Sequence, residues 1–168
     1  MRLVLQLLSL AFLAVPYVNA QVPCNTNRFN DTFLDKLEGD WIGKGHVARE
    51  EVSYAIHAKW ELNHQFFHIS LSDMAKNPQY AAEIYIGYEC ITARYIVHWI
   101  DPFGGLSSET LGNGKASATG IDFEFNYPSG VLVNHFIMNS DSTWEMKTDS
   151  QNANGEWSNF GDVFMKRK

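Results

Sequence analysis

Apolar and polar residues alternate along much of the chain after residue 50. The alternation is clear in three segments, 52–61, 121–127 and 143–147. Successive side chains of a β-strand point to opposite faces of its sheet, so a period of two is typical of a strand with one buried face. We therefore expect strands in all three segments.

Clusters of turn-forming residues separate these runs and several weaker ones, at 76–78, 102–105, 112–114, 128–130, 139–142 and 152–155. Short strands at such spacing are typical of an antiparallel sandwich or barrel, and no intervening segment is long enough for the crossover helix of a parallel sheet. We expect ten strands, at roughly residues 39–48, 51–62, 64–73, 80–89, 93–101, 106–115, 118–127, 131–139, 142–149 and 155–166.

An open sheet of ten strands would leave two unpaired edges, which closure into a barrel removes. We therefore predict an all-β antiparallel meander closed into a roughly ten-stranded barrel. Apolar residues at three- and four-residue intervals between 29 and 37 predict a short helical turn before it, with Asn30 or Asp31 as its cap. No repeat or linker divides residues 21–168, so we expect one domain with a short leader at 21–28.

The first twenty residues have the features of a signal peptide. Arg2 supplies a positive charge, residues 3–15 form an apolar run, and Ala20 ends a small-residue cleavage site. The run is shorter than the roughly 20 residues that span a bilayer, and Gln6 interrupts it. We expect cleavage after Ala20, no membrane-spanning segment in the remaining chain, and export to a periplasm or to the outside of the cell.

Export changes the interpretation of the two cysteines, Cys24 and Cys90. Disulfides form in oxidising compartments, so a Cys24–Cys90 bond is expected, with two free thiols as the alternative if the residues lie too far apart. Asn30 begins an Asn-Asp-Thr sequon, which is a glycosylation site if the source is eukaryotic.

The charge of the chain excludes one class of partner. Lysine and arginine number 13 against 19 aspartates and glutamates, for a formal charge of −6, and no basic stripe interrupts this balance. Phosphate binding needs concentrated positive charge. We therefore expect no nucleic-acid partner.

The interior of the predicted barrel is the first candidate site. A barrel of eight or more strands can hold a small ligand, and this chain has 5 Trp, 7 Tyr and 11 Phe. We expect a small, largely apolar molecule in the lumen. The alternative is a barrel filled by its own side chains that acts through its surface. The candidate wall residues are Tyr54, Ile56, Phe123, Phe125, Trp144 and Met146.

A second hypothesis is an enzyme of unknown reaction, such as an isomerase or hydrolase. His98 could act as acid or base if it faces the lumen beside Arg94 or Glu83. In the opposite phase Trp99 and its alternating neighbours line the lumen, and His98 lies outside. Both faces of this strand carry apolar residues, so both phases remain open.

The pattern Gly39-Asp40-Trp41 near the start of the first strand, with Lys166-Arg167-Lys168 at the end, resembles the calycin superfamily of lipocalins and fatty-acid-binding proteins. The resemblance implies that Trp41 plugs one end of the barrel and that Arg167 packs over it, as a guanidinium can stack on an indole.

Further motifs follow in a fixed order, namely Trp60, Ile86-Gly87-Tyr88-Glu89, residues 95–101 and Gly155-Glu156-Trp157. This order, over residues 33–168, is similar to that of an uncharacterised, largely bacterial group of calycin-like domains. The resemblance implies a ten-stranded barrel and no established reaction. The segment 41–45 also resembles nitrobindin-like haem barrels, which bind iron through a histidine near the C-terminus. No histidine follows His135, so we expect no haem. The six histidines lack a chelating spacing along a strand, and the alternative is a site formed across strands by His68, His98 and His135. Because buried histidines more often pair with neighbouring groups, we expect no metal.

Overall fold

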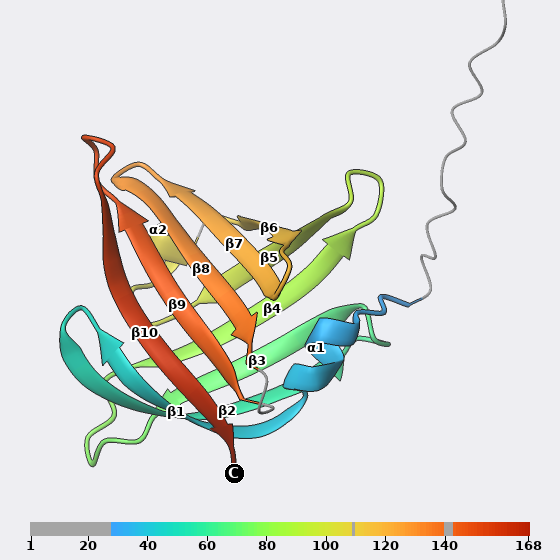
Figure 1. Ribbon diagram of the computed structural model, residues 1–168, viewed down its shortest axis with the longest axis horizontal. Helices are drawn as coiled ribbons and strands as arrows, with labels where there is room; N and C mark the ends of the chain where they lie inside the picture. The colour runs from blue at the N-terminus through green and yellow to red at the C-terminus, as the bar shows by residue number, and fades with distance from the viewer. Residues whose placement is uncertain (1–27, 109, 140–142) are drawn as a thin grey trace, which may run out of the picture.

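Ten antiparallel strands form a closed barrel in the computed structural model, which describes residues 28–108, 110–139 and 143–168 (Figure 1). Each strand pairs with the next along the chain, and β1 pairs with β10, so the predicted all-β meander barrel is confirmed. The strands are β1 (Gly39–Val47), β2 (Glu50–Glu61), β3 (Phe66–Asp73), β4 (Ala81–Glu89), β5 (Arg94–Ile100), β6 (Gly112–Ala116), β7 (Gly120–Tyr127), β8 (Gly130–Met138), β9 (Trp144–Gln151) and β10 (Trp157–Arg167). The helices are α1 (Thr32–Leu37) and α2 (Gly105–Ser108).

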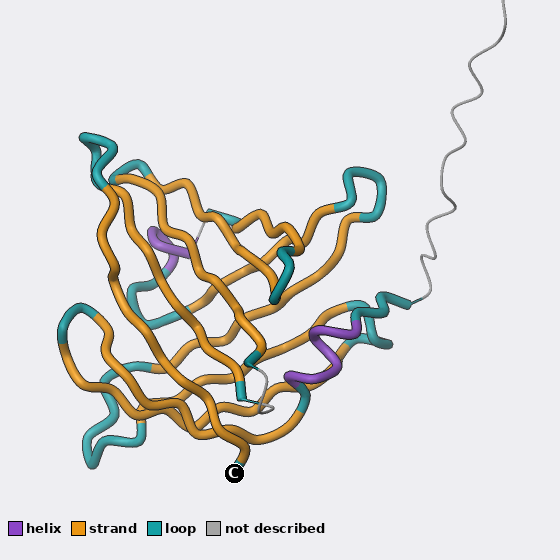
Figure 2. Tube along the Cα trace, viewed as in Figure 1, coloured by secondary structure: helices purple, strands orange, loops and turns teal. Residues whose placement is uncertain are grey.

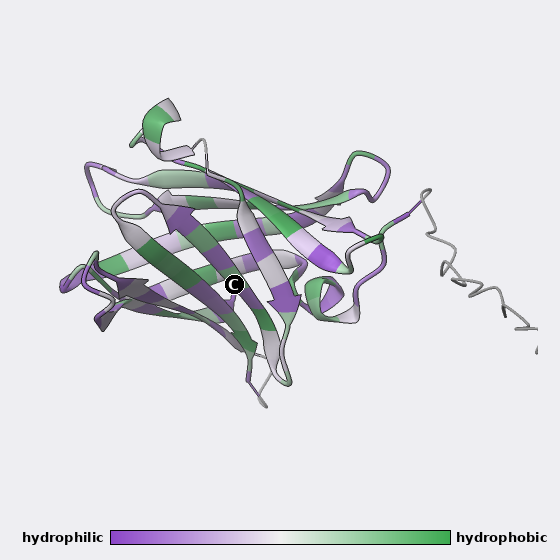
Figure 3. Ribbon diagram, turned by 90° about the horizontal axis from the view of Figure 1, so that it is seen from above, coloured by the Kyte–Doolittle hydropathy of each residue, from purple (hydrophilic) through white to green (hydrophobic). Residues whose placement is uncertain are grey.

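The side-chain alternation seen in the sequence separates the inside of the barrel from the outside. Along β7, for example, Ile121, Phe123 and Phe125 are buried, whereas Glu124 between them is exposed. Figure 3 shows the resulting bands of hydrophobic and hydrophilic residues along the strands. The core therefore lies within one closed sheet.

The helix α1 begins at a side-chain cap and covers one end of the barrel. The Asp31 carboxylate accepts hydrogen bonds from the backbone N–H groups of Phe33 and Leu34, at 2.8 and 2.9 Å. Such a cap satisfies amide groups that have no partner within the helix. The other Asp31 oxygen accepts a hydrogen bond from the Tyr95 hydroxyl of β5 at 2.5 Å, which ties the helix to the barrel.

The segment predicted as a strand at 106–115 is different in the structure. Residues Gly105–Ser108 form α2, and β6 is limited to Gly112–Ala116. The predicted turn at 112–114 is therefore wrong, since Gly112 and Gly114 face inward within β6. A Cβ atom on Gly114 would lie 2.7 Å from the Phe123 ring, so glycine here allows an aromatic ring to pack directly on the backbone.

Because the strands run up and down in sequence order, alternate connections meet at opposite ends of the barrel. One end, which we call the closed end, carries α1 and the connections at 62–65, 90–93 and 117–119. The opposite end, which we call the open end, carries α2 and the connections at 48–49, 74–80, 128–129 and 152–156. Figure 2 shows the two helices at these different ends. The two ends therefore differ in what covers them.

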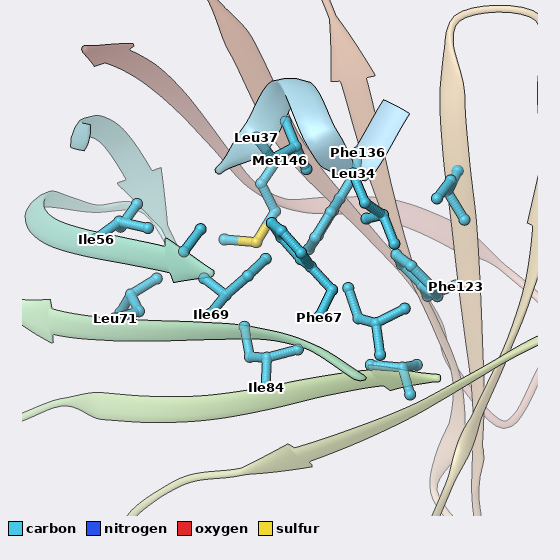
Figure 4. Close-up of a cluster of buried hydrophobic side chains, with 14 of the residues drawn as sticks. Leu34, Leu37, Ile56, Phe67, Ile69, Leu71, Ile84, Phe123, Phe136 and Met146 are labelled. Atoms are coloured by element: carbon cyan, nitrogen blue, oxygen red, sulfur yellow. The ribbon is translucent and has the colours of Figure 1, made fainter. Parts of the chain in front are cut away.

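Trp41 fills the closed end. Its ring is 1% exposed, and its Nε1 atom donates a hydrogen bond to the carbonyl oxygen of Leu37 at 2.7 Å. The side chains of Leu34 and Leu37 point from α1 toward the cluster of buried residues in Figure 4. The Arg167 guanidinium lies over the Trp41 ring, 4.3 Å from its centroid. The structure thus brings together the two residues that the calycin resemblance assigned to barrel closure.

Several predictions fall on residues that the structure does not describe. The signal peptide at 1–20 and Cys24, the expected partner of Cys90, lie outside the described residues. Both stay predictions. Asn30, the potential glycosylation site, is exposed immediately before α1. Among the described residues, none of the helices has the length and apolar character required to cross a membrane.

Candidate functional site

A cavity of about 520 Å³ occupies the open half of the barrel, and we call it the open-end pocket. Its walls come from β1, β2, β3, β5, β7, β8, β9 and β10 and from the connections at the open end. Seven described residues form what we call the aromatic wall: Tyr54, Tyr80, Trp99, Phe103, Phe125, Tyr127 and Phe160.

Large buried side chains pack together in the core between the open-end pocket and the closed end. Trp41 and Trp144 meet edge to face there, with ring centroids 6.2 Å apart, and Phe136 packs against both Trp144 and Phe123. Figure 4 shows Phe67, Phe123 and Phe136 among the buried apolar side chains of the core. The alternative of a barrel that acts through its surface requires side chains to fill the whole interior. The open-end pocket shows that they do not.

The polar groups of the pocket form a short chain of hydrogen bonds near its mouth. The Trp99 Nε1–H group donates to the Tyr80 hydroxyl at 3.0 Å, and this hydroxyl donates to Asp101 Oδ2 at 3.2 Å. The other oxygen, Asp101 Oδ1, accepts from the backbone N–H of Phe103 at 3.0 Å. These contacts fix the carboxylate at the rim.

The tyrosines of this pocket keep their protons well above neutral pH. Burial raises the pKa of Tyr80 far above its ordinary value, and the nearby Asp101 charge raises it further. Burial also raises the pKa of Tyr54 and Tyr127, with smaller contributions from Asp73 and Asp101 respectively. All three phenols are therefore neutral; those of Tyr54 and Tyr127 can donate a hydrogen bond to a ligand, whereas the Tyr80 hydroxyl already donates to Asp101.

A second polar pair lies deeper in the pocket. The Thr148 hydroxyl donates a hydrogen bond to Asn134 Oδ1 at 2.7 Å, and both residues are buried. Their strands β8 and β9 are adjacent, and the two residues are direct partners in the sheet register. The pair gives an otherwise apolar wall one fixed polar position.

Three of the six predicted wall residues line the open-end pocket, namely Tyr54, Phe125 and Met146. The other three, Ile56, Phe123 and Trp144, are buried but do not line it. Alternation along a strand identifies the inward face, but it does not say how far along the barrel a residue lies.

The fifth strand turns His98 and Arg94 away from the lumen. Val97 is buried and Trp99 lines the open-end pocket, so alternation along β5 places His98 on the outer face. There its Nε2 atom lies 2.9 Å from the carbonyl oxygen of Ser108 in α2. The placement in the lumen that the enzyme hypothesis requires is therefore wrong.

Glu83 also lies on the outer face, because its neighbour Ile84 on β4 is buried in the core. A Glu83 oxygen lies 2.5 Å from His68 Nε2, and the other accepts a hydrogen bond from the Ser70 hydroxyl at 3.2 Å. The His68 ring stacks on Tyr85, with centroids 4.4 Å apart. Glu83 thus belongs to a polar cluster outside the barrel.

Several pocket residues were missed at the sequence level, and some of them had a usable signal. Tyr127 continues the inward alternation of Phe125, and Thr148 continues that of Met146. Tyr80 and Asp101 lie just outside strands β4 and β5, in step with the inward-facing Ala82 and Trp99. Alternation extended by one residue places both of them inward, but no pattern in the sequence marks their contact with each other.

The pocket does not fit the haem site that the nitrobindin-like resemblance implies. Histidine and cysteine are absent from the described residues that line it, so its walls supply neither of these iron ligands. Over the described parts of the chain, no group of three His, Cys, Asp or Glu side chains is arranged to hold a metal ion.

The sequence matches no protein-family model and no curated protein. Among solved structures, the fold is similar to that of Rv2717c from M. tuberculosis, with a TM-score of 0.58 and 15% sequence identity. The match covers 80% of this chain and 94% of that one. At this level of identity the likeness shows a common fold, consistent with a calycin-like barrel.

Proposed function

We propose that this protein binds a small, largely apolar molecule in the open-end pocket. The observation that carries the proposal is the cavity of about 520 Å³ with its aromatic wall. Ligand sites are typically concave, mostly apolar and roughly 300–1,000 Å³ in volume, with a few polar groups that set orientation. The open-end pocket has each of these properties.

The source of the binding energy is the burial of apolar surface. Such burial contributes roughly 25 cal/mol for each Å² of ligand surface that leaves water, before the cost of immobilising the ligand. Met146 and Leu132 add aliphatic surface to the aromatic wall. The polar groups of Tyr80, Asn134 and Thr148 would then orient the ligand by hydrogen bonding.

The proposed setting is outside the cytoplasm. The signal-peptide features of residues 1–20 support export, and export supports a Cys24–Cys90 disulfide. A carrier in a periplasm or outside the cell would meet its ligand there. No bound metal or haem is part of the proposal.

A test of the proposed function uses Nile red, a neutral dye that fluoresces in apolar surroundings. Saturable binding by the processed protein is expected. In the variant Leu132→Trp the larger side chain occupies the pocket, and we expect the affinity for the dye to fall at least about tenfold.

The matched control is Val133→Trp. Val133 is the next residue along β8, so its side chain points to the outer face, and this variant should bind the dye as the parent protein does. Absence of saturable binding by the parent protein, or equal loss in both variants, would contradict the proposed site.

A further inference from the structure

The described lining of the open-end pocket carries one charged side chain, and its charge is negative. Asp101 is the one charged residue among the described residues of the lining, which include no lysine, arginine or histidine. Arg49 lies beside the lining residue Ala48, but it is exposed at the tip of the β1–β2 turn and does not line the cavity. A ligand in the pocket therefore meets a negative charge without a compensating positive one.

The contacts of Asp101 leave its charge in place. Both carboxylate oxygens accept hydrogen bonds from neutral donors, the Tyr80 hydroxyl and the Phe103 backbone N–H. Within the described residues Asp101 forms no ion pair. Neutral donors stabilise a carboxylate but do not neutralise it, so the carboxylate remains able to pair with a cation.

The aromatic wall adds a second feature that favours positive charge. The rings of Tyr54 and Tyr80 lie 6.1 Å apart, Tyr80 and Phe103 lie 6.2 Å apart, and Trp99 meets Phe125 edge to face at 6.5 Å. Aromatic faces attract cations through their quadrupoles, and several rings around one site are the usual receptor for ammonium groups.

From these two observations we infer that the open-end pocket selects molecules with an apolar body and an organic ammonium head. This inference rests on the proposed function and names the chemical class of its ligand. The head group lies at the rim, near Asp101 and the rings of Tyr80 and Phe103, and the apolar body extends toward Met146. A fatty-acid carboxylate would find no cationic partner in the lining and would face the charge of Asp101.

The net charge of the chain acts in the same direction. A formal charge of −6 gives the protein a field that attracts cations and repels anions. This long-range effect is screened by salt, whereas contacts within the pocket are screened much less. Measurements at about 0.15 M salt therefore report mainly the local contribution of the site.

The test compares three molecules that share a ten-carbon chain: decyltrimethylammonium, 1-decanol and decanoate, each below the concentration at which it aggregates. Affinity is measured by calorimetry on the processed protein. We expect decyltrimethylammonium to bind about tenfold tighter than 1-decanol, and decanoate to bind more weakly than either.

Two variants separate the local charge from the general field. Asp101→Asn keeps the shape and one of the two acceptor oxygens, and should lower the affinity for the ammonium compound about tenfold relative to the affinity for 1-decanol. Glu50→Gln removes an equal charge from the exposed start of β2, also at the open end but outside the lining, and should change neither.

The outcomes distinguish this inference from the proposed function. If 1-decanol binds but the three head groups bind equally, or decanoate binds most tightly, the inference is overturned and the proposed function stands. If none of the three binds, the proposed function fails as well. If Asp101→Asn does not fold, as judged by circular dichroism, the ranking of the three molecules on the parent protein still decides.

Discussion

The guanidinium of Arg167, on the last strand, lies 4.3 Å from the centroid of the Trp41 ring, on the first. The same guanidinium donates hydrogen bonds to the carbonyl oxygens of Lys36 and Glu38, both at 3.0 Å. These carbonyls lie at the end of α1, where helical carbonyls lack partners within the helix. One side chain therefore connects the last strand of the barrel to the first strand and to α1.

The variant Trp41→Ala should be strongly destabilised. The side chain is almost completely buried, and truncation of a large buried aromatic residue typically costs about 3–5 kcal/mol through lost burial and the cavity left behind. The measurement is urea unfolding followed by circular dichroism. A loss close to zero would show that Trp41 does not plug the core.

The variant Arg167→Met keeps most of the side-chain length but removes the charge and both hydrogen bonds. We expect a loss of about 1–2 kcal/mol, from the cation–π contact and the unsatisfied carbonyls of α1. If the contact with Trp41 contributes, the double variant with Trp41→Phe should lose less than the sum of the two single losses. Additive losses would contradict a direct interaction.

The variant Gly114→Ala tests the close packing of β6 on β7. The new methyl group would meet the Phe123 ring at 2.7 Å and Tyr95 Cβ at 2.8 Å, so we expect a destabilisation of about 1–3 kcal/mol from overpacking. Gly105→Ala is the matched control, because nothing lies within 4 Å of its added methyl group. Equal thermal stability of the two variants would refute the packing explanation.

The buried tyrosines predict a loss of stability at alkaline pH. The folded protein holds the Tyr80 proton above the pH at which the unfolded chain releases it, near 10. The unfolded state is then favoured as its phenol ionises, so the free energy of unfolding should fall as the pH rises above about 10. Urea unfolding at a series of pH values measures this slope.

The variant Tyr80→Phe isolates the contribution of that residue. It loses the hydrogen bonds to Trp99 and Asp101 and should be less stable than the parent at neutral pH, but its stability should fall less steeply above about pH 10. The control is Tyr85→Phe, on the outer face, which shows how much the loss of one phenol group by itself changes the free energy of unfolding and its pH dependence. An identical slope for Tyr80→Phe and the parent would refute the role of Tyr80.

A disulfide between Cys24 and Cys90 stays a prediction that mass spectrometry can check. On reduction the processed protein should gain the mass of two hydrogen atoms. The reduced protein should be less stable by about 2–4 kcal/mol, because the bond limits the freedom of the unfolded chain. An unchanged mass on reduction would show two free thiols.

The strands were predictable where the two faces of the sheet differ in polarity. On β7, buried phenylalanines alternate with charged residues, and the sequence identifies both the strand and its inward face. On β5, Ile96 and Ile100 lie outside while Tyr95 and Val97 lie inside. Apolar residues on both faces leave no contrast, so the position of His98 could be determined only from the structure.

The pocket was less predictable than the barrel, because its mouth is formed by connections. Tyr80, Asp101 and Phe103 meet through hydrogen bonds and ring contacts between two separate loops. No residue pattern within one strand encodes such a contact. The same limit explains why α2 was missed, since residues 105–108 carry neither a clear alternation nor an apolar stripe.

The asymmetry between the two ends of the barrel governs the exchange of any guest molecule. Trp41 fills the core at one end and α1 covers it, so we expect the proposed ligand to enter and leave the open-end pocket through the open end. The residence time of the ligand would then depend on the connections at the open end and on how deeply its apolar body is inserted. A protein with the proposed function would therefore act as a reservoir, which retains its ligand but does not pass it from one end of the barrel to the other.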